Sequence, residues 1–521
     1  MDGKKLNRRD FLRMSAIVAA GAGLTACGPQ QAAPSTDGSA EVIEQTVIVE
    51  GTPVVVTATP APQTVTISVG AYVPTEWTER STEHPTVTNA PRILAEKFKE
   101  VENIDIKWIR NNAEGQTDTY MSAWFDALAA AGTMPDVTSL AHEIPILKGY
   151  ALPINEYLEQ PSKYAPQYTR WMDSFYPSIM NALKYPNGNI YCSPVQDKIT
   201  GFEVGMFLNM DWMKKIGMEA PKTWSEQKAV GQALKEAGSS WIPWPPEAIE
   251  GNIWALGLQI LPSFLQPECA IMDTDGDKFV GAPEALVALR NGLVGPLTDK
   301  YKAAWREQKA VVAHWAEGWA SADVEALWRN GEVGMRQSGA WEVTAQMSDP
   351  NITFERVFVP PASVLSTDHE FASDPPEWTK GDGKVPEGNL VMINGPDQGL
   401  AAVTKERGTI DQAIKWLQWT TEPENNAFLV NENQNLVPAV VDASIGPIWT
   451  ELLSYPMPKY EYSIAWWGEC LQFDNTLFNE TRKLFVAWAT DQMDDETFFA
   501  RQQEETVAGA NRYEEAIEAQ S

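Results

Sequence analysis

The order of apolar and polar positions defines the start of the main body of the chain. Residues Thr64–Gly70 alternate β-branched apolar and polar side chains, which predicts a strand, and Ile104–Ile109 predicts a second one. The helical spacing within Asn89–Glu100 predicts a helix between them. One face of this helix collects the apolar residues Ile93, Leu94, Phe98 and Val101.

The same rhythm continues along the chain. Tyr120–Ala131 predicts another amphipathic helix that Gly132 closes, and a third strand begins at Pro135. Strand, helix, strand, helix and strand in this order are typical of a mainly parallel sheet with crossover helices. The fold class predicted is therefore α/β.

The first 26 residues have the layout of an export signal. Basic residues precede an apolar run over Met14–Ala26, which is too short to span a bilayer as a permanent helix. The string Asn7-Arg8-Arg9-Asp10-Phe11-Leu12-Arg13 resembles a twin-arginine signal, which a receptor reads as an address. No other segment of the sequence is apolar for about eighteen residues.

Cys27 ends this signal in the string Leu24-Thr25-Ala26-Cys27-Gly28, which resembles the bacterial lipobox. The resemblance implies cleavage before Cys27 and acylation of its thiol, so the mature chain would be tethered by acyl chains. The alternative is a buried cysteine in a first helix. Residues 27–63 are rich in Pro, Thr, Ser, Ala and Val and predict a flexible linker, with a hairpin over Thr46–Thr57 as the alternative.

Length and charge limit the classes of function. About 458 residues follow the linker, which suits two lobes better than a single core. The net charge is −30, and it becomes −33 once the signal removes five positive and two negative charges. Such a surface repels nucleic acid and anionic lipid.

The cysteines and aromatic residues narrow the chemistry further. Cys192, Cys269 and Cys470 are an odd number without close spacing, so one disulfide or none is compatible with them, and a metal cluster is not expected. The 21 Trp residues partly fill cores, but a flat indole also matches the apolar face of a sugar ring.

Several short motifs follow one another in a fixed order along the chain. They are Ala130-Ala131-Gly132-Thr133-Met134-Pro135-Asp136-Val137, the hairpin of residues 185–194, Phe207-Leu208-Asn209-Met210-Asp211-Trp212, Pro221-Lys222-Thr223-Trp224, Gly331-Glu332-Val333-Gly334-Met335 and Ser338-Gly339-Ala340-Trp341. Together they resemble the large extracellular solute-binding proteins of ABC importers, the class that includes maltodextrin-binding protein. Their order extends over residues 64–521. Residues 360–390, rich in Pro and Asp, and the aromatic residues 162–180 depart from the family pattern.

The resemblance implies two hinged lobes, each a mainly parallel sheet flanked by helices, with three chain crossings. Lobe one is expected at 64–200 plus 352–437 and lobe two at 203–350 plus 440–521. No cofactor or metal is implied, and the expected partners are a small solute and the permease subunits of an importer. A monomer, held to the membrane only through its lipid anchor, is expected.

Motifs for catalysis or metal binding are better explained as local structure. Asp273-Thr274-Asp275-Gly276-Asp277 resembles a calcium loop, but its Gly is fourth instead of sixth, so we interpret it as a turn. Ser225 and Lys228 match the Ser-x-x-Lys pattern of β-lactamase-like enzymes, but Thr223 and Glu226 form a capping box at the same place. A carboxylate pair for glycoside hydrolysis stays open, because sequence does not show side-chain separations.

Ligand residues are predicted from their position after strands and from their chemistry. In lobe one, Tyr72 and Trp77 follow the first strand, and His142 and Glu143 lie in a loop that resembles the family's Trp-Ala-His-Asp loop. Glu143 would pair with a hydroxyl and His142 would orient it, while Leu140 replaces the family's aromatic residue. In lobe two the candidates are Glu203, Trp254, Trp341, Trp466 and Trp467, and for each aromatic residue a packed core position is the alternative.

These features predict a receptor that closes around a sugar or oligosaccharide and does not alter it. A peptide or polyol receptor with the same lobes is the first alternative. A surface enzyme that degrades glycosides and an adhesive surface protein are the others.

Overall fold

The computed structural model describes most of the chain, with gaps. The described residues are 44–49, 52–57, 63–68, 90–109, 125–139, 148–184, 188–197, 204–242, 259–319, 323–339, 342–385, 397–433, 437–464 and 475–518. The chain forms two compact units, Met1–Pro62 and Gln63–Ser521. None of the described helices is long and apolar enough to cross a membrane.

The N-terminal unit contains a hairpin within the segment predicted to be a linker. Strand β1 (Glu44–Val49) pairs antiparallel with β2 (Thr52–Thr57), and Val47 lies opposite Val54. The flexible-linker prediction is therefore wrong for these two strands, and the hairpin alternative is confirmed. The β-branched residues on both sides of Gly51 and Pro53 explain this pairing.

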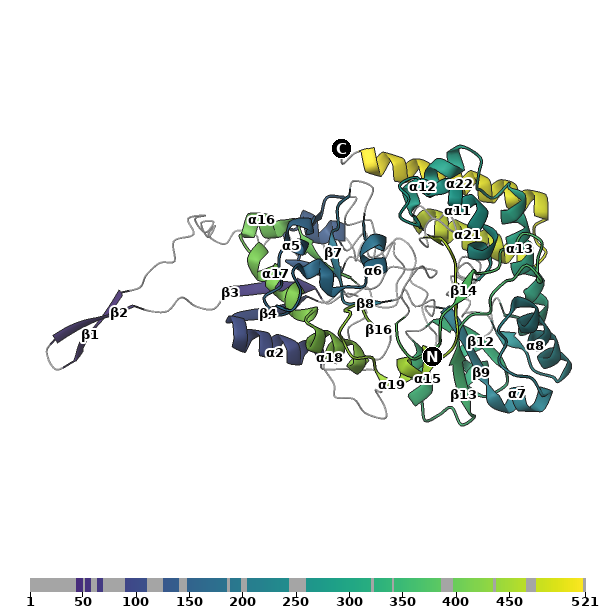
Figure 1. The fold of residues 1–521 in the computed structure, drawn as a ribbon, viewed down its shortest axis with the longest axis horizontal. Coiled ribbons are helices and arrows are strands. Elements are labelled where there is room, and N and C mark those ends of the chain that lie inside the picture. The colour runs from purple at the N-terminus through teal and green to yellow at the C-terminus, as the bar shows by residue number, and fades with distance from the viewer. Residues whose placement is uncertain are drawn as a thin grey trace, which may run out of the picture. The chain divides into compact units, whose positions relative to one another are not determined.

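A six-stranded sheet organises the first half of the second unit (Figure 1). Strand β3 (Gln63–Ser68) pairs parallel with both β4 (Ile104–Ile109) and β5 (Val137–Ser139). Strand β15 (Asp397–Ala401) then pairs antiparallel with β5, β6 (Ala151–Leu152) and β7 (Cys192–Pro194). All strands of this sheet except β15 therefore run in one direction, as predicted for a mainly parallel sheet, and the single antiparallel strand β15 comes from a distant part of the chain.

Three helices contact this sheet or each other: α2 (Ala90–Glu102), α17 (Ile410–Thr420) and α18 (Pro423–Asn433) (Figure 1). Leu94 and Phe98 of α2 are buried as predicted, but Ile93 and Val101 are 37% and 56% exposed. The Phe98 ring meets Trp416 of α17 edge to face, with ring centroids 5.3 Å apart. We call the buried residues around this sheet the first core; it includes Val65, Leu94, Phe98, Trp171 and Trp416.

A four-stranded sheet organises the other half. Strand β9 (Val204–Asn209) pairs antiparallel with β12 (Met335–Gly339) on one side and with β13 (Arg356–Val359) on the other. Strand β10 (Trp241–Ile242) adds to β12 in parallel. Strands β10, β12 and β13 run in one direction, and only β9 runs against them. The second core packs on it and includes Met206, Leu208, Val230, Leu234 and Met335.

Local sequence explains the helices that follow β9. Helix α7 (Met210–Ile216) starts where the Asn209 side chain accepts hydrogen bonds from two backbone N–H groups, and it ends at Gly217 with φ 68°. Helix α8 (Trp224–Glu236) starts with the predicted capping box of Thr223 and Glu226, which is therefore confirmed. Figure 1 shows both helices beside β9 and β12.

A helical layer completes the second half. It comprises α10 (Leu261–Phe264), α11 (Gln266–Met272), α12 (Ala282–Arg290), α13 (Asp299–Val311), α21 (Asn475–Ala489) and α22 (Asp495–Glu518). Aromatic rings join these helices: Trp488 stacks on Phe498 with centroids 4.2 Å apart, and Trp305 meets Phe498 edge to face. Trp305 and Trp488 are therefore core residues, as expected for a part of the 21 Trp residues.

Short elements connect these layers. They are α5 (Asn155–Leu158), η1 (Trp171–Ser174), α6 (Pro177–Ala182), β8 (Gln196–Asp197), β11 (Phe279–Val280), η4 (Val312–His314), α14 (Val324–Arg329), α15 (Val343–Ser348), β14 (Glu377–Trp378), α16 (Val403–Arg407), β16 (Val437–Pro438), α19 (Pro447–Leu452), β17 (Pro458–Lys459) and β18 (Ser463–Ile464). Strand β16 pairs antiparallel with β8, and β11 pairs parallel with β18.

The pairing and packing place chain segments differently from the expected lobe boundaries. Residues 356–359 were expected in lobe one but pair with β9 in the four-stranded sheet. Val440 and Ala443 were expected in lobe two but pack in the first core. Both predicted boundaries lie too early in the chain. The hydrophobic pattern of the sequence does not change where the chain crosses between the lobes.

The two segments that depart from the family pattern are both anchored by packing. Trp171 and Phe175 of the aromatic stretch lie in the first core, and Trp171 Nε1–H donates to Thr421 Oγ1. Residues 360–385, which we call the 360–385 segment, attach to the second half. Its Ser363 N–H and Thr379 N–H donate to the carbonyls of Lys222 and Met457.

Candidate functional site

All of the residues predicted to bind ligand, together with the lipobox cysteine, lie outside the described residues. They are Tyr72, Trp77, His142, Glu143, Glu203, Trp254, Trp341, Trp466, Trp467 and Cys27. Their roles therefore stay predictions. The structure does place the strands next to which these residues lie in the sequence.

In the six-stranded sheet, these strand ends meet at one edge. Ile67 pairs in parallel with Val137, so β3 and β5 end on the same side, and Ser139 pairs antiparallel with Gln398. The C-terminal ends of β3 and β5 and the N-terminal end of β15 therefore share an edge. The segments that contain Tyr72 and His142 start there.

A second edge forms in the four-stranded sheet. Gly339, the last residue of β12, pairs with Val204, the first residue of β9. Glu203 directly precedes β9, and Trp341 follows β12 by two positions. Strand β10 runs parallel to β12, so its C-terminal end points toward the same edge, and Trp254 follows it in the sequence. Trp466 and Trp467 instead follow β18, which pairs with β11 and belongs to neither main sheet.

Strand β12 approaches this edge with three consecutive buried polar residues. Arg336 and Gln337 are each 1% exposed, and Ser338 is fully buried. Because side chains alternate along a strand, Arg336 and Ser338 lie on one face and Gln337 on the other. Buried polar groups are costly unless they are paired, so their presence at a strand end indicates a functional or positional role.

On the first face, one nitrogen of Arg336 binds two carboxylates. Arg336 Nη2 lies 2.7 Å from Glu325 Oε2 and 2.6 Å from Glu342 Oε2. The guanidinium also lies over the Phe207 ring, 6.0 Å from its centroid. Burial raises the pKa of Glu325, but the Arg336 charge and hydrogen bonds from Arg329 and Gln346 outweigh it and leave this pKa lowered.

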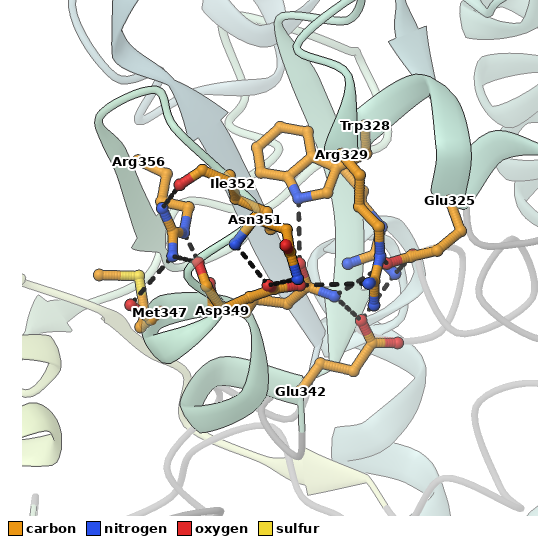
Figure 2. Close-up of polar contacts among 11 residues, drawn as sticks. Glu325, Trp328, Arg329, Glu342, Met347, Asp349, Asn351, Ile352 and Arg356 are labelled. Atoms are coloured by element: carbon orange, nitrogen blue, oxygen red, sulfur yellow. Dashed lines mark hydrogen bonds and ion pairs between the residues drawn. The ribbon is translucent and has the colours of Figure 1, made fainter. Parts of the chain in front are cut away.

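Further polar contacts extend this network around α14 and α15 (Figure 2). Arg329 Nε lies 2.9 Å from Glu325 Oε1, and Arg329 Nη1 lies 3.2 Å from Asp349 Oδ2. Trp328 Nε1–H donates to Gln346 Oε1 over 3.1 Å. Arg356 donates to backbone carbonyls, among them those of Gln346 and Met347. The whole region is therefore tied by charge-assisted hydrogen bonds.

On the opposite face, β12 presents neutral polar groups. Neither amide atom of Gln337 has a hydrogen-bond partner among the described residues. Gln337 shares this face with Met335, which packs in the second core. In that core, Gln259 Nε2–H donates to Gln227 Oε1 over 3.2 Å and to the Ala362 carbonyl over 3.3 Å. Amides of this kind can both donate to and accept from a hydroxyl group.

Arg336 and Gln337 were not predicted as site residues, although the family motifs on both sides of them were identified. A signal was present, since Arg336-Gln337-Ser338 places three consecutive polar residues between two family motifs, in what proves to be a buried strand. Such a run just before the Gly-x-Trp element is unusual for a strand in a core.

The carboxylates of the acidic turn between α11 and β11 accept hydrogen bonds from backbone N–H groups of the same turn. The side chains of Asp273, Asp275 and Asp277 place carboxylate oxygens within 4.8 Å of one another. Asp273 accepts from the N–H groups of Gly276 and Lys278, and Asp277 Oδ1 accepts from Phe279 N–H over 2.7 Å. Burial raises the pKa of Asp277; the Phe279 N–H lowers it, and the charges of Asp275 and Asp273 raise it again.

Glu284, the residue at the twelfth position from Asp273, acts as a cap. Its carboxylate accepts hydrogen bonds from the Thr274 and Gly281 N–H groups and from the Thr274 hydroxyl. These contacts support the interpretation of this segment as a turn that leads into α12.

Comparison with solved structures finds the same fold in sugar-binding receptors. A cyclic α-maltosyl-1,6-maltose binding protein from Arthrobacter globiformis is 15% identical, with TM-score 0.58, over 87% of this chain and 100% of that one. The galacto-N-biose/lacto-N-biose I-binding protein of an ABC transporter from Bifidobacterium longum is 16% identical, with TM-score 0.56, over 88% and 99%. The GacH receptor of Streptomyces glaucescens, described both unliganded and in complex with acarbose, is 16% identical, with TM-score 0.54, over 88% and 98%.

At these identities the likeness establishes the fold alone. A comparison with curated proteins found no match in sequence. The family model for bacterial extracellular solute-binding proteins matches residues 94–452. That match covers more than half of the chain and includes parts of both main sheets. The chain therefore belongs to the family of bacterial extracellular solute-binding proteins.

Proposed function

We propose that this protein is a membrane-tethered receptor that captures a sugar or oligosaccharide and delivers it to an ABC importer. The observation that carries the proposal is the family match together with relatives of the same fold over more than four fifths of the chain. Those relatives are described as binding a cyclic maltosyl-maltose, lacto-N-biose and acarbose. All three are polyhydroxylated molecules of more than one ring.

The chemistry at the edge of the four-stranded sheet supports a ligand of this class. Buried amides such as that of Gln337 pair well with hydroxyl groups, which both donate and accept. We propose that the aromatic residues stack on sugar faces and that Glu143, Glu203 and His142 hold hydroxyls. The proposed aromatic contacts are Tyr72, Trp77, Trp254, Trp341, Trp466 and Trp467.

The mechanism proposed is closure of two hinged lobes around the solute. The pairing of β8 with β16 supports a hinge, because it joins segments far apart in sequence near the chain crossings. A solute that contacts both edges makes more contacts in the closed state than in the open state, so binding shifts the population toward closure. The importer would then recognise the closed form. No covalent step is proposed.

Export and anchoring complete the proposal. The twin-arginine string and the lipobox support translocation, cleavage before Cys27 and acylation of its thiol. The receptor would then work outside the cytoplasm as a monomer, next to permease subunits. Labelling with a fatty-acid analogue tests this: the wild-type chain should incorporate label, and the Cys27→Ala chain should not.

A melting-temperature screen tests the ligand class. The purified chain would be heated with monosaccharides, oligosaccharides, polyols and peptides, each in excess. A solute at 100 times its dissociation constant adds about 2.7 kcal/mol to the free energy of unfolding. We expect stabilisation by at least one oligosaccharide, and loss of that stabilisation in Trp341→Ala and Trp254→Ala.

Two results would contradict the proposal. Stabilisation by peptides and by no saccharide would overturn the sugar assignment. Turnover of a glycoside by the purified chain would replace the receptor with an enzyme.

A further inference from the structure

Arg336 joins three elements through a single nitrogen atom. Its Nη2 contacts Glu325, which lies in the first turn of α14, and Glu342, which directly precedes α15. Arg336 itself lies in β12, three residues before Gly339, which pairs with Val204. The guanidinium thereby fixes the starts of two helices relative to the strand that reaches the proposed binding edge.

The network is poorly explained as a device for stability alone. Arg336 is 1% exposed, and its Nε and Nη1 have no hydrogen-bond partner among the described residues. Removing a guanidinium from water is costly, and well-packed apolar residues often give equal or greater stability at such places. A buried ion pair does, however, favour one arrangement of the elements that carry its partners. Any arrangement that separates the partners leaves a buried charge without compensation.

The geometry constrains the chain on both sides of the edge. Gly339 is held by its pairing with Val204, and Glu342, three residues later, is held by Arg336. On the other side, Glu325 follows the Asp323 cap of α14 by two residues. The starts of α14 and α15 are thus both held by the buried guanidinium of Arg336.

We propose that Arg336 is a positioning residue for solute binding, which acts by holding Glu342 and Glu325 at the end of β12 without touching the solute. This inference rests on the proposed function. Without Arg336 the two carboxylates face each other and repel, so the starts of α14 and α15 separate. Binding then weakens even in molecules that remain folded.

The test measures the dissociation constant for the oligosaccharide that most stabilises the wild-type chain. Isothermal titration is performed well below the melting temperature on wild type, Arg336→Met, Arg336→Lys, Glu342→Gln and the Arg336→Met/Glu342→Gln double variant. We expect Arg336→Met to weaken binding about tenfold, a size that residues without ligand contact can reach. Arg336→Lys keeps the charge and should recover part of the affinity.

Two further readouts separate positioning from general stability. The double variant should lose less affinity than the two single losses combined, because Arg336 and Glu342 act through one contact. The affinity of Arg336→Met should also recover in part at lower pH, since protonation of Glu325 removes one of the two charges that repel. Of the other charged groups facing the described network, Asp349 remains in every variant and Arg329 is removed only in the control.

Arg329→Met is the matched control. It removes ion pairs to Glu325 and Asp349 in the same network but leaves the contact of Arg336 with Glu342. Affinity should change less than about twofold in this variant, within the range of distant substitutions. If Arg329→Met weakens binding as much as Arg336→Met, or if Arg336→Met binds like wild type, the positioning role is overturned. If no solute binds the wild-type chain, the proposed function itself fails.

Discussion

Neighbouring charges determine in which direction the pKa of a partly buried carboxylate shifts in this protein. Glu325 is two-thirds buried, yet it stays ionised because Arg336 and Arg329 lie beside it. Asp277 shows the opposite balance, since its burial raises the pKa and neighbouring Asp residues add to that effect. The same residue type thus meets two electrostatic environments, and only the surrounding charges distinguish them.

Replacement of Glu325 by Gln should destabilise the protein in a pH-dependent way. The folded pKa of Glu325 is lowered, so its ionised form contributes stability above its unfolded pKa of roughly 4.3. That contribution is lost as the pH falls through the folded pKa. Urea unfolding at neutral pH should show a loss of about 2 kcal/mol, less than the roughly 3–5 kcal/mol for removing one partner of a fully buried ion pair, because Glu325 is partly exposed and Arg336 keeps its contact with Glu342.

Urea unfolding of the same Glu325→Gln variant at acid pH serves as the comparison, because wild-type Glu325 progressively loses its charge as the pH falls toward its lowered pKa. The difference between the two proteins should then shrink. An equal difference at both pH values would show that the loss comes from packing and not from charge.

At the scale of elements, close backbone approach shapes the four-stranded sheet. Gly205 of β9 faces Phe358 and Val359 of β13, and β9 has neighbours on both sides. The 360–385 segment then continues from β13 and attaches to α8 through hydrogen bonds. Asp368 accepts from Ser225 N–H with one oxygen and from Leu365 N–H with the other.

Substitution of Gly205 by Ala should weaken this sheet. A Cβ atom at this position would lie 2.5 Å from Phe358 Cζ and 2.6 Å from the Val359 carbonyl oxygen. Overpacking of this kind costs about 1–3 kcal/mol, which thermal unfolding would show. A second change, Phe358→Leu, should relieve only the ring contact, so full recovery in the double variant would argue against the carbonyl clash.

Substitution of Asp368 by Ala should loosen the 360–385 segment while the rest of the fold remains. Both carboxylate oxygens are lost, so hydrogen exchange should accelerate at Ser225, at Leu365 and in the following residues. Asp382→Ala is the control, because Asp382 Oδ1 accepts from Lys384 N–H within the segment. Equal acceleration in both variants would mean that the link to α8 does not hold the segment.

At the scale of the whole molecule, the chain has two compact units of very different size. The unit Gln63–Ser521 holds both main sheets and their cores, whereas Met1–Pro62 contains the β1–β2 hairpin. The cores are built from residues far apart in sequence, such as Phe98 with Trp416. The smaller unit contributes none of the described core residues.

A chain that begins at Gln63 should therefore fold by itself. We expect its melting temperature and its affinity for the stabilising solute to match those of the longer chain. Calorimetry and titration on the two proteins would check this. A lower melting temperature would show that residues before Gln63 support the body.

Short-range patterns predicted individual elements well. The strand at Ile104–Ile109, the capping box at Thr223 and the order of the family motifs follow from spacing along the chain. The lobe boundaries and the mixed pairing of both sheets did not, because β13 and β15 join strands more than a hundred residues away. The polar run of β12 carried a signal, but its partners Glu325 and Glu342 could not be identified from spacing alone.

The sequence by itself determined the α/β class, the family, the export signal pattern and the chemistry of the residues predicted to bind ligand. Hydrophobic period, caps and motifs are local, and local interactions are encoded in neighbouring residues. Only the tertiary structure decided which strands pair, which tryptophans become core and that two carboxylates converge on Arg336. Those outcomes depend on contacts between distant segments, whose geometry is set when the cores pack.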